Sequence, residues 1–261
     1  MEVARQAPLI EISALSKSFA RRALLRRRSF SLHDIDITAN RGEVVGLLGE
    51  SGSGKSTLAN IMTLLTAFDS GTYQFKGQDV TGFDRAARFA FKSQVQIVFQ
   101  DPYGSLNPRA DVREIVGEGL LLHQRDLTPP EREARLRALL DDVGLPAAAL
   151  DRYPRAFSGG QRQRIAIARA LAVGPEVLIC DEPLSSLDVS IQAQILELFA
   201  RLIREHNLTM VLITHDIHVA RLLCDRVYVM HDGRIVEQGP AASILTDPQQ
   251  DYTRRLLAAA Y

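Results

Sequence analysis

The chain has 261 residues, with 31 Lys and Arg side chains against 31 Asp and Glu side chains, so its formal net charge is zero. A length near 260 suits one large domain or a domain with a lobe, because single cores stop growing at about 250–300 residues. The 46% apolar and 24% charged content is typical of a folded protein and excludes a disordered one. The balanced charge argues against nucleic acid as a partner.

The cysteine count and the lengths of the apolar runs indicate in which cellular environment the chain works. Cys180 and Cys224 are too few for a disulfide framework or a four-thiolate metal site, so we expect a reduced, intracellular environment. Residues 1–13 have no apolar run of signal-peptide length, and a run of about 18 apolar residues occurs nowhere in the sequence. We therefore expect that any role at a membrane is that of a peripheral subunit.

Strand and helix patterns alternate along the chain. Short apolar, β-branched runs predict strands, which are residues 9–15, 32–38, 43–48, 94–99, 177–180, 209–214 and 227–230. Apolar residues at helical spacing predict helices, which are residues 58–66, 112–122, 131–143, 160–172 and 189–204. This alternation indicates an α/β fold with a mostly parallel sheet. We predict a single domain (1–261) with an α/β core at about residues 1–100 and 175–261 and an inserted helical lobe at about 101–174.

A basic stretch follows the first predicted strand. Residues 21–29 contain five arginines. The simplest interpretation is a solvated loop, and contact with an acidic membrane surface or an acidic partner is the alternative.

Residues 49–56 match the phosphate-loop pattern G-x-x-x-x-G-K-[ST] between a predicted strand and a predicted helix. Its glycines let the backbone fold around a phosphate with N–H groups pointing inward, next to a helix N-terminus. Lys55 can reach the β- and γ-phosphates, and the Ser56 hydroxyl can ligate Mg²⁺. The predicted nucleotide-binding residues of this loop are Gly49, Glu50, Ser51, Gly52, Ser53, Gly54, Lys55, Ser56 and Thr57.

Two carboxylates follow the apolar run 177–180. Downstream of a phosphate loop, Asp181 is expected to hold Mg²⁺ through water, and Glu182 is expected to polarise the attacking water as general base. Taken alone the pair is a weak signal, because strands often end in a solvated charge. Cys180 is interpreted as a small buried hydrophobe.

A second anion site is predicted at the start of the helix 160–172. Residues 157–164 read Phe-Ser-Gly-Gly-Gln-Arg-Gln-Arg, and a helix N-terminus attracts anions. This run resembles the signature Leu-Ser-Gly-Gly-Gln of the nucleotide-binding subunit of ABC transporters, with Phe157 in place of leucine. The resemblance implies a P-loop ABC ATPase cassette that binds ATP and Mg²⁺, with a mixed or parallel sheet core and an inserted helical lobe. The matching signature residues are Ser158, Gly159, Gly160 and Gln161.

Other motifs of that family match in order. The resemblance implies that Phe19 stacks on adenine, that Gln100 contacts nucleotide and Mg²⁺, and that His215 contacts the γ-phosphate. Taken singly, these would be a core aromatic, a surface amide and a core histidine. The implied catalytic residues are Lys55, Glu182 and His215, and the implied Mg²⁺ ligands are Ser56, Gln100 and Asp181.

The chain contains one phosphate loop and one signature. The resemblance implies a head-to-tail pair of cassettes, in which residues 158–160 of one subunit close over the γ-phosphate held by the other. Residues 185–188, Ser-Ser-Leu-Asp, match the loop that crosses this dimer interface, and residues 234–239 match the family's late strand.

Residues 99–109, Phe-Gln-Asp-Pro-Tyr-Gly-Ser-Leu-Asn-Pro-Arg, resemble the peptide and nickel importer branch, as does the tail 247–257. This implies a subunit on the cytoplasmic face of the inner membrane that works with a sister ATPase, two membrane permease subunits and, indirectly, a solute-binding protein. Importers of this branch commonly pair two different ATPases, so a heterodimer leads over a homodimer. No cysteine follows Cys224, so we expect none of the iron–sulfur clusters that many members carry.

The function has open alternatives. The solute could be a peptide, nickel or a metallophore, because selectivity resides in other subunits. A non-transport ATPase within an enzyme complex such as carbon–phosphorus lyase would keep every ATP motif. A cytosolic ABC protein that acts on ribosomes or DNA usually joins two cassettes in one chain, which this sequence does not show.

The segment after Gln100 is the expected contact with the permease. In ABC importers this region receives a short helix from the membrane subunit. We expect Tyr103, Leu106 and Val112 to supply apolar anchors, of the kind that dominates small interfaces. A proline-rich turn without a partner is the alternative.

Overall fold

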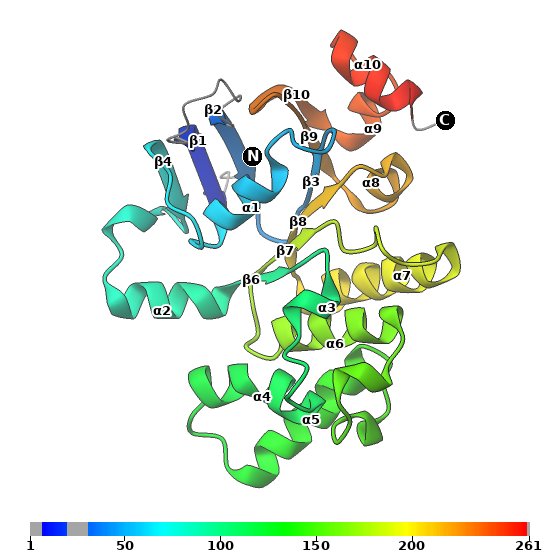
Figure 1. The fold of residues 1–261 in the computed structure, drawn as a ribbon. Coiled ribbons are helices and arrows are strands. Elements are labelled where there is room, and N and C mark those ends of the chain that lie inside the picture. The colour runs from blue at the N-terminus through cyan, green and yellow to red at the C-terminus, as the bar shows by residue number, and fades with distance from the viewer. Residues whose placement is uncertain (1–6, 20–30, 260–261) are drawn as a thin grey trace, which may run out of the picture. The chain divides into compact units, whose positions relative to one another are not determined.

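The computed structural model describes residues 7–19 and 31–259, which divide into two compact units (Figure 1). The first unit comprises Met1–Arg88 with Thr209–Tyr261, and the second comprises Phe89–Leu208. The arginine-rich stretch 21–29 lies outside the described residues. The predicted division near residues 100 and 175 stays a prediction.

An antiparallel sheet opens the first unit. Its strands lie in the order β2-β1-β4-β5. Their bounds are β1 (Ile10–Ser18), β2 (Ser31–Ala39), β4 (Ser70–Phe75) and β5 (Gln78–Asp79). The sequence predicted β1 and β2. It did not predict β4, which begins with polar residues, or β5, which consists of two polar residues.

A second group of strands carries the phosphate loop. The central strand β3 runs parallel to β8 on one side and β9 on the other, and β10 pairs antiparallel with β9. Their bounds are β3 (Val44–Leu48), β8 (Thr209–Thr214), β9 (Arg226–His231) and β10 (Arg234–Pro240). Every residue of β3 and β8 is buried, which agrees with the continuous apolar runs of parallel strands.

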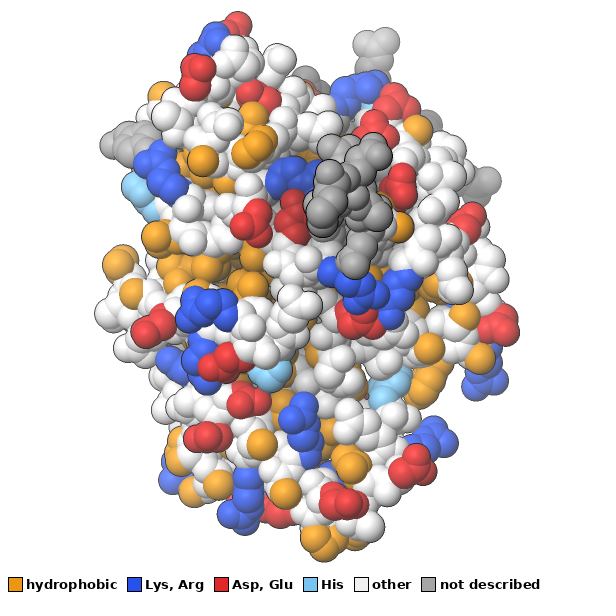
Figure 2. All heavy atoms as spheres, turned by 180° about the vertical axis from the view of Figure 1, so that it is seen from behind, with side chains coloured by type: hydrophobic (Ala, Val, Ile, Leu, Met, Phe, Trp, Pro, Cys, Tyr) orange, Lys and Arg blue, Asp and Glu red, His pale blue; other side chains and the backbone are white. Residues whose placement is uncertain are grey.

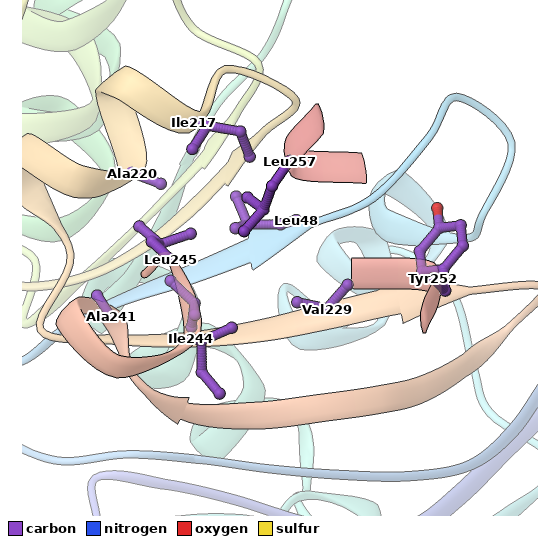
Figure 3. Close-up of a cluster of buried hydrophobic side chains, with 10 residues drawn as sticks. Leu48, Ile217, Ala220, Val229, Ala241, Ile244, Leu245, Tyr252 and Leu257 are labelled. Carbon is purple, nitrogen blue, oxygen red and sulfur yellow. The ribbon is translucent and has the colours of Figure 1, made fainter. Parts of the chain in front are cut away.

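The helices of the first unit cover these strands. Their bounds are α1 (Lys55–Met62), α8 (Ile217–Leu223), α9 (Ala241–Ile244) and α10 (Asp251–Ala258). α1 ends four residues before its predicted end at residue 66, because Leu64 takes a left-handed φ of 57° and the Met62 carbonyl accepts the Tyr73 hydroxyl. α8, α9 and α10 pack on β3 and β9 through one apolar cluster (Figure 3).

The second unit combines two parallel strands with a set of helices. β6 (Val95–Val98) pairs with β7 (Val177–Asp181). The helices are α3 (Pro102–Ser105), α4 (Val112–His123), α5 (Pro129–Asp142), α6 (Gly159–Leu171) and α7 (Val189–His206). All but the one-turn α3 were predicted to within two residues at each end, and capping boxes mark the starts of α4, α5 and α6. α2 (Arg85–Gln94) was not predicted.

The charged side chains and the helix lengths bear on two expectations from the sequence, the balanced charge and the lack of a membrane span. Acidic and basic side chains are mixed over the face that Figure 2 shows. Within residues 7–19 and 31–259, no helix combines the length and the apolar character that a membrane span requires.

Candidate nucleotide site

The phosphate loop joins β3 to α1 in the first unit. Gly52 and Gly54 take φ values of 83° and 119°, which L side chains rarely adopt. Gly49 has a φ of 151°, and a Cβ atom there would lie 2.2 Å from the Met230 carbonyl oxygen. The glycines of the predicted motif are therefore required by backbone conformation and by close packing.

Lys55 lies inside this loop. Its buried Nζ donates to the carbonyl oxygens of Gly49 and Glu50 at 2.8 and 2.9 Å. In the described part of the chain no side chain caps α1, whose first turn also holds no acidic residue. Unused N–H groups at a helix N-terminus attract anions, so the loop and the adjacent Ser56 hydroxyl fit a phosphate with its Mg²⁺.

His215 emerges at the same sheet edge as the phosphate loop. Leu48 of β3 stands opposite Thr214 of β8 in parallel register, so Gly49 and His215 each follow a paired position. Asp216 caps α8 by accepting from the His218 N–H at 2.8 Å, and this fixes the turn that holds His215. The sequence placed both motifs at strand ends, and the register puts those ends side by side.

Phe19 follows β1 directly and is 41% exposed. The end of β1 is held by Asp69, which accepts from the Lys17 Nζ and the Ser18 N–H, both at 2.8 Å. The hydrogen bond from Lys17, together with those from Ser18, lowers the pKa of the Asp69 carboxyl from 3.8 to about 2. An exposed ring at a fixed strand end is suited to stacking, and its contact with adenine stays a prediction.

Gln100 and Glu182 meet in the second unit. β6 and β7 pair with Val98 opposite Cys180, so both residues follow the same edge. The Gln100 Nε2 donates to Glu182 Oε2 and to Ser185 Oγ, each at 3.3 Å, and Ser185 Oγ donates to the Glu182 carbonyl oxygen at 3.1 Å. The sequence predicted roles for Gln100 and Glu182 but not that they touch.

Glu182 has an unusual backbone. Its φ of 46° is left-handed, a conformation that is uncommon for a residue with a Cβ atom and that clusters at functional sites. Asp181 ends β7 and is buried. Burial raises the pKa of the Cys180 thiol, which confirms Cys180 as a buried hydrophobe.

The signature residues begin α6. Ser158 caps the helix, and the Ser158 N–H donates to Gln161 Oε1 at 3.0 Å, which closes a capping box. A Cβ atom at Gly160 would lie 2.4 Å from Ile191 Cγ2, so a glycine is needed for the signature to pack against the start of α7. Ile191 could not be identified from the sequence, because it matches no motif.

Two of the three expected permease anchors are wrong, and the third, Tyr103, stays a prediction. Tyr103 is 67% exposed, but Leu106 and Val112 are buried, so neither of the latter can anchor a partner. Tyr103 lies over the guanidinium of Arg162, whose central carbon is 3.7 Å from the ring centroid. The buried Arg162 also donates from Nε to the Pro154 carbonyl oxygen at 2.7 Å.

The predicted site residues fall into two sets. The phosphate loop, Phe19 and His215 belong to the first unit. Gln100, Asp181, Glu182 and the signature belong to the second. The contacts described above each join residues of the same unit.

Known proteins resemble this chain over most of its length. The family model described as ABC transporter matches residues 32–185. The peptidoglycan transport ATP-binding protein YejF of Agrobacterium fabrum is 48% identical over 227 residues, which are 87% of this chain and 41% of YejF. The chain therefore spans less than half the length of that relative. The oligopeptide transport ATP-binding protein OppF of Bacillus subtilis is 44% identical over 252 residues, which are 96% of this chain and 82% of OppF.

A solved structure shows the same fold. The ATP-binding cassette MJ0796, in a dimeric post-hydrolysis state bound to ADP and Pi, matches with a TM-score of 0.78 and 28% identity. The match covers 89% of this chain and 98% of that cassette. The predicted α/β fold with a P-loop ABC core is thereby confirmed. The chain belongs to the ABC transporter family and is one of its ATPase cassettes.

Proposed function

We propose that this chain is the ATP-hydrolysing subunit that energises an ABC importer of the peptide and nickel branch, with a peptide as its solute. The hydrogen-bonded set of Gln100, Glu182 and Ser185 carries the hydrolytic part of the proposal. The names of the relatives, which are transport ATP-binding proteins for oligopeptide and peptidoglycan, support peptide over nickel.

The working unit in this proposal is a head-to-tail dimer at the cytoplasmic face of the inner membrane. Residues 158–160 of one cassette close over the nucleotide that the other holds in its phosphate loop. The uncapped α1 and the capping box at Ser158 supply one helix N-terminus from each side. A sister ATPase is the preferred second cassette, and two permease subunits complete the transporter.

The proposed hydrolysis gives each predicted site residue one role. The attacking water forms the new bond to the γ-phosphorus, the bond to the β–γ bridging oxygen breaks, and Glu182 takes the proton. The Gln100 amide, which already donates to Glu182 Oε2, orients that carboxylate. Lys55 and His215 contact the phosphates. Ser56, Gln100 and Asp181 would hold Mg²⁺, which neutralises phosphate charge when it is bound.

Coupling to the permeases is proposed to run through Tyr103. Its exposed ring rests on Arg162 of the signature helix α6, and Arg169 of the same helix donates to the Ser105 carbonyl oxygen. Two arginines of one helix thus hold the short α3 at both ends. A partner that pushes on Tyr103 would therefore act on the helix that begins with the signature.

A complementation experiment tests the proposed function. A strain that lacks this chain is supplied with the wild type or with Glu182→Gln, and uptake of a labelled oligopeptide is measured beside growth on a phosphonate. We expect uptake with the wild type only, because loss of a general base lowers turnover by about 10²–10⁴-fold while ATP still binds.

The two readouts separate the alternatives. Normal peptide uptake without the chain, combined with failure to grow on the phosphonate, would favour the carbon–phosphorus lyase role. Glu182→Gln protein that hydrolyses ATP at the wild-type rate would remove Glu182 from the mechanism.

A further inference from the structure

The C-terminal part of the chain holds the phosphate loop through two hydrogen bonds. The Glu50 N–H donates to the Tyr252 hydroxyl of α10 at 3.2 Å. The Gly233 N–H, in the turn between β9 and β10, donates to the Ser53 carbonyl oxygen at 3.0 Å. All of these residues belong to the first unit. The second contact involves backbone only, whereas the first depends on one side chain.

Packing on several sides fixes the Tyr252 ring. It stacks on His231 with the ring centroids 3.9 Å apart and the planes 26° from parallel. It also belongs to the apolar cluster that includes Leu48 and Val229, and only 8% of the residue is exposed. In Figure 3 the ring lies at the edge of this cluster, beside the loop that follows β3. The position of the hydroxyl is therefore determined by the core and not by the loop.

The hydroxyl and Lys55 hold opposite ends of the same peptide group. The carbonyl of the Gly49–Glu50 peptide accepts from Lys55 Nζ at 2.8 Å, and its N–H donates to Tyr252. Lys55 is also the residue expected to contact the phosphates of a bound nucleotide, so its three donors are then shared between that carbonyl and the ligand. The Tyr252 hydroxyl holds the N–H end of the peptide independently of Lys55.

We propose that Tyr252 is a positioning residue for nucleotide binding, which keeps the Gly49–Glu50 peptide in the orientation that the closed phosphate loop requires. A loop already held in its binding conformation loses less entropy when the ligand binds. Without the hydroxyl, the part-buried Glu50 N–H loses the side-chain acceptor that it has in this structure, and the peptide is no longer held at both ends by side chains. The effect should fall on nucleotide affinity and not on the chemical step.

The experiment compares two tyrosine variants of the full chain. Tyr252→Phe removes the hydroxyl but keeps the ring, its stack on His231 and its apolar contacts. Tyr228→Phe is the matched control, because the Tyr228 hydroxyl also accepts a backbone N–H, that of Thr38 at 3.0 Å, and Tyr228 is also buried in the first unit. Binding of methylanthraniloyl-ATP is titrated by fluorescence, and melting temperatures are recorded for both variants.

We expect Tyr252→Phe to weaken nucleotide binding about three- to tenfold, the size of one lost hydrogen bond. In the assembled ATPase the KM for ATP should rise with kcat unchanged. Tyr228→Phe should lower the melting temperature and leave nucleotide affinity at the wild-type value.

Three results would overturn the proposal. The first is unchanged affinity in Tyr252→Phe. The second is an equal loss of affinity in both Phe variants, which would make the effect one of general stability. The third is a loss of affinity in Tyr252→Leu that Tyr252→Phe does not share, because it would assign the effect to ring packing.

Discussion

Single side chains at the ends of strands decide how the nucleotide site is presented. Asp69 is such a residue, since its carboxylate accepts from the Lys17 Nζ and from both the N–H and the hydroxyl of Ser18. Phe19 follows immediately, so the direction in which its ring leaves β1 depends on this cluster. The sequence offered no signal for it, because Asp69 and Lys17 are 52 residues apart.

Asp69→Asn should destabilise the first unit in a pH-dependent way. The folded-state pKa of Asp69 is lowered from 3.8 to about 2, so the carboxylate stabilises the fold above the unfolded-state pKa and loses this effect as the pH falls towards 2. Wild type should therefore melt above Asp69→Asn at pH 6, and the difference should shrink between pH 4 and pH 2. Thermal unfolding at these pH values measures it.

Lys17→Met and the double variant provide the control. If the Lys17–Asp69 contact is the cause, the double variant should be less destabilised than the sum of the two single variants. A difference between wild type and Asp69→Asn that persists unchanged at pH 2 would contradict the assignment.

Residue types lead to predicted roles for the site residues, which stay predictions, but they did not show which side chains are exposed. The phosphate loop, Glu182 and His215 follow from motif and strand position. Leu106 and Val112 were expected to be surface anchors because they are apolar and next to Tyr103. Both are buried instead, since α3 and α4 pack against α6 and turn these side chains inward.

At the scale of elements, α6 connects the parts of the second unit. Its N-terminus carries the signature, and its side chains Arg162 and Arg169 contact the segment after Gln100. Arg162 is buried, and a planar guanidinium can stack on a ring and donate to a carbonyl at the same time. A lysine keeps the positive charge, but its ammonium group is not planar and lacks the fixed arrangement of N–H donors that a guanidinium has.

Arg162→Lys should lower the free energy of unfolding by about 1–3 kcal/mol, because a buried hydrogen bond to Pro154 and the stack on Tyr103 are lost. Arg155→Lys is the matched control, since Arg155 lies over the ring of Tyr153 at 5.6 Å on the exposed surface. Its effect should stay within about 0.5 kcal/mol. Urea unfolding of both variants makes the comparison, and equal effects would show that the burial of Arg162 is unimportant.

The elements that the sequence missed share a cause. β4 pairs with the distant β1, β5 is a two-residue strand that pairs with β4, and both carry polar residues, so neither has a continuous apolar run. In α2 the apolar residues are interrupted by several charged ones. α8 is only seven residues long. The predicted elements include the fully buried strands β3, β7 and β8 and the helices α4, α5 and α6 with their capping boxes, whose patterns do not depend on distant partners.

For the whole molecule, the proposed function requires a second cassette to complete the site. We predict that the purified chain is mostly monomeric and a weak ATPase alone, because it holds one phosphate loop and one signature. Sedimentation velocity with Mg–ATP, using Glu182→Gln to slow hydrolysis, should show a dimer only when the sister cassette is added. A tight homodimer with full activity would contradict the heterodimer and leave the ATPase assignment intact.

The fold class and the family could be predicted because several motifs follow one another along the chain in the order that the family has. The family model and the match to MJ0796 confirm them. Which solute is carried cannot be read from this chain, since the proposed site contacts nucleotide and other subunits only.

The contact between Gly160 and Ile191 also limits how the family's sequences can change. A Cβ atom at 160 would lie 2.4 Å from Ile191 Cγ2, so position 160 can grow only where position 191 shrinks. The two positions are 31 residues apart, one in the signature run 158–161 and the other in α7, shortly after residues 185–188. They should therefore covary as a pair, and a cassette that lost its signature glycine should show a smaller residue at the start of α7.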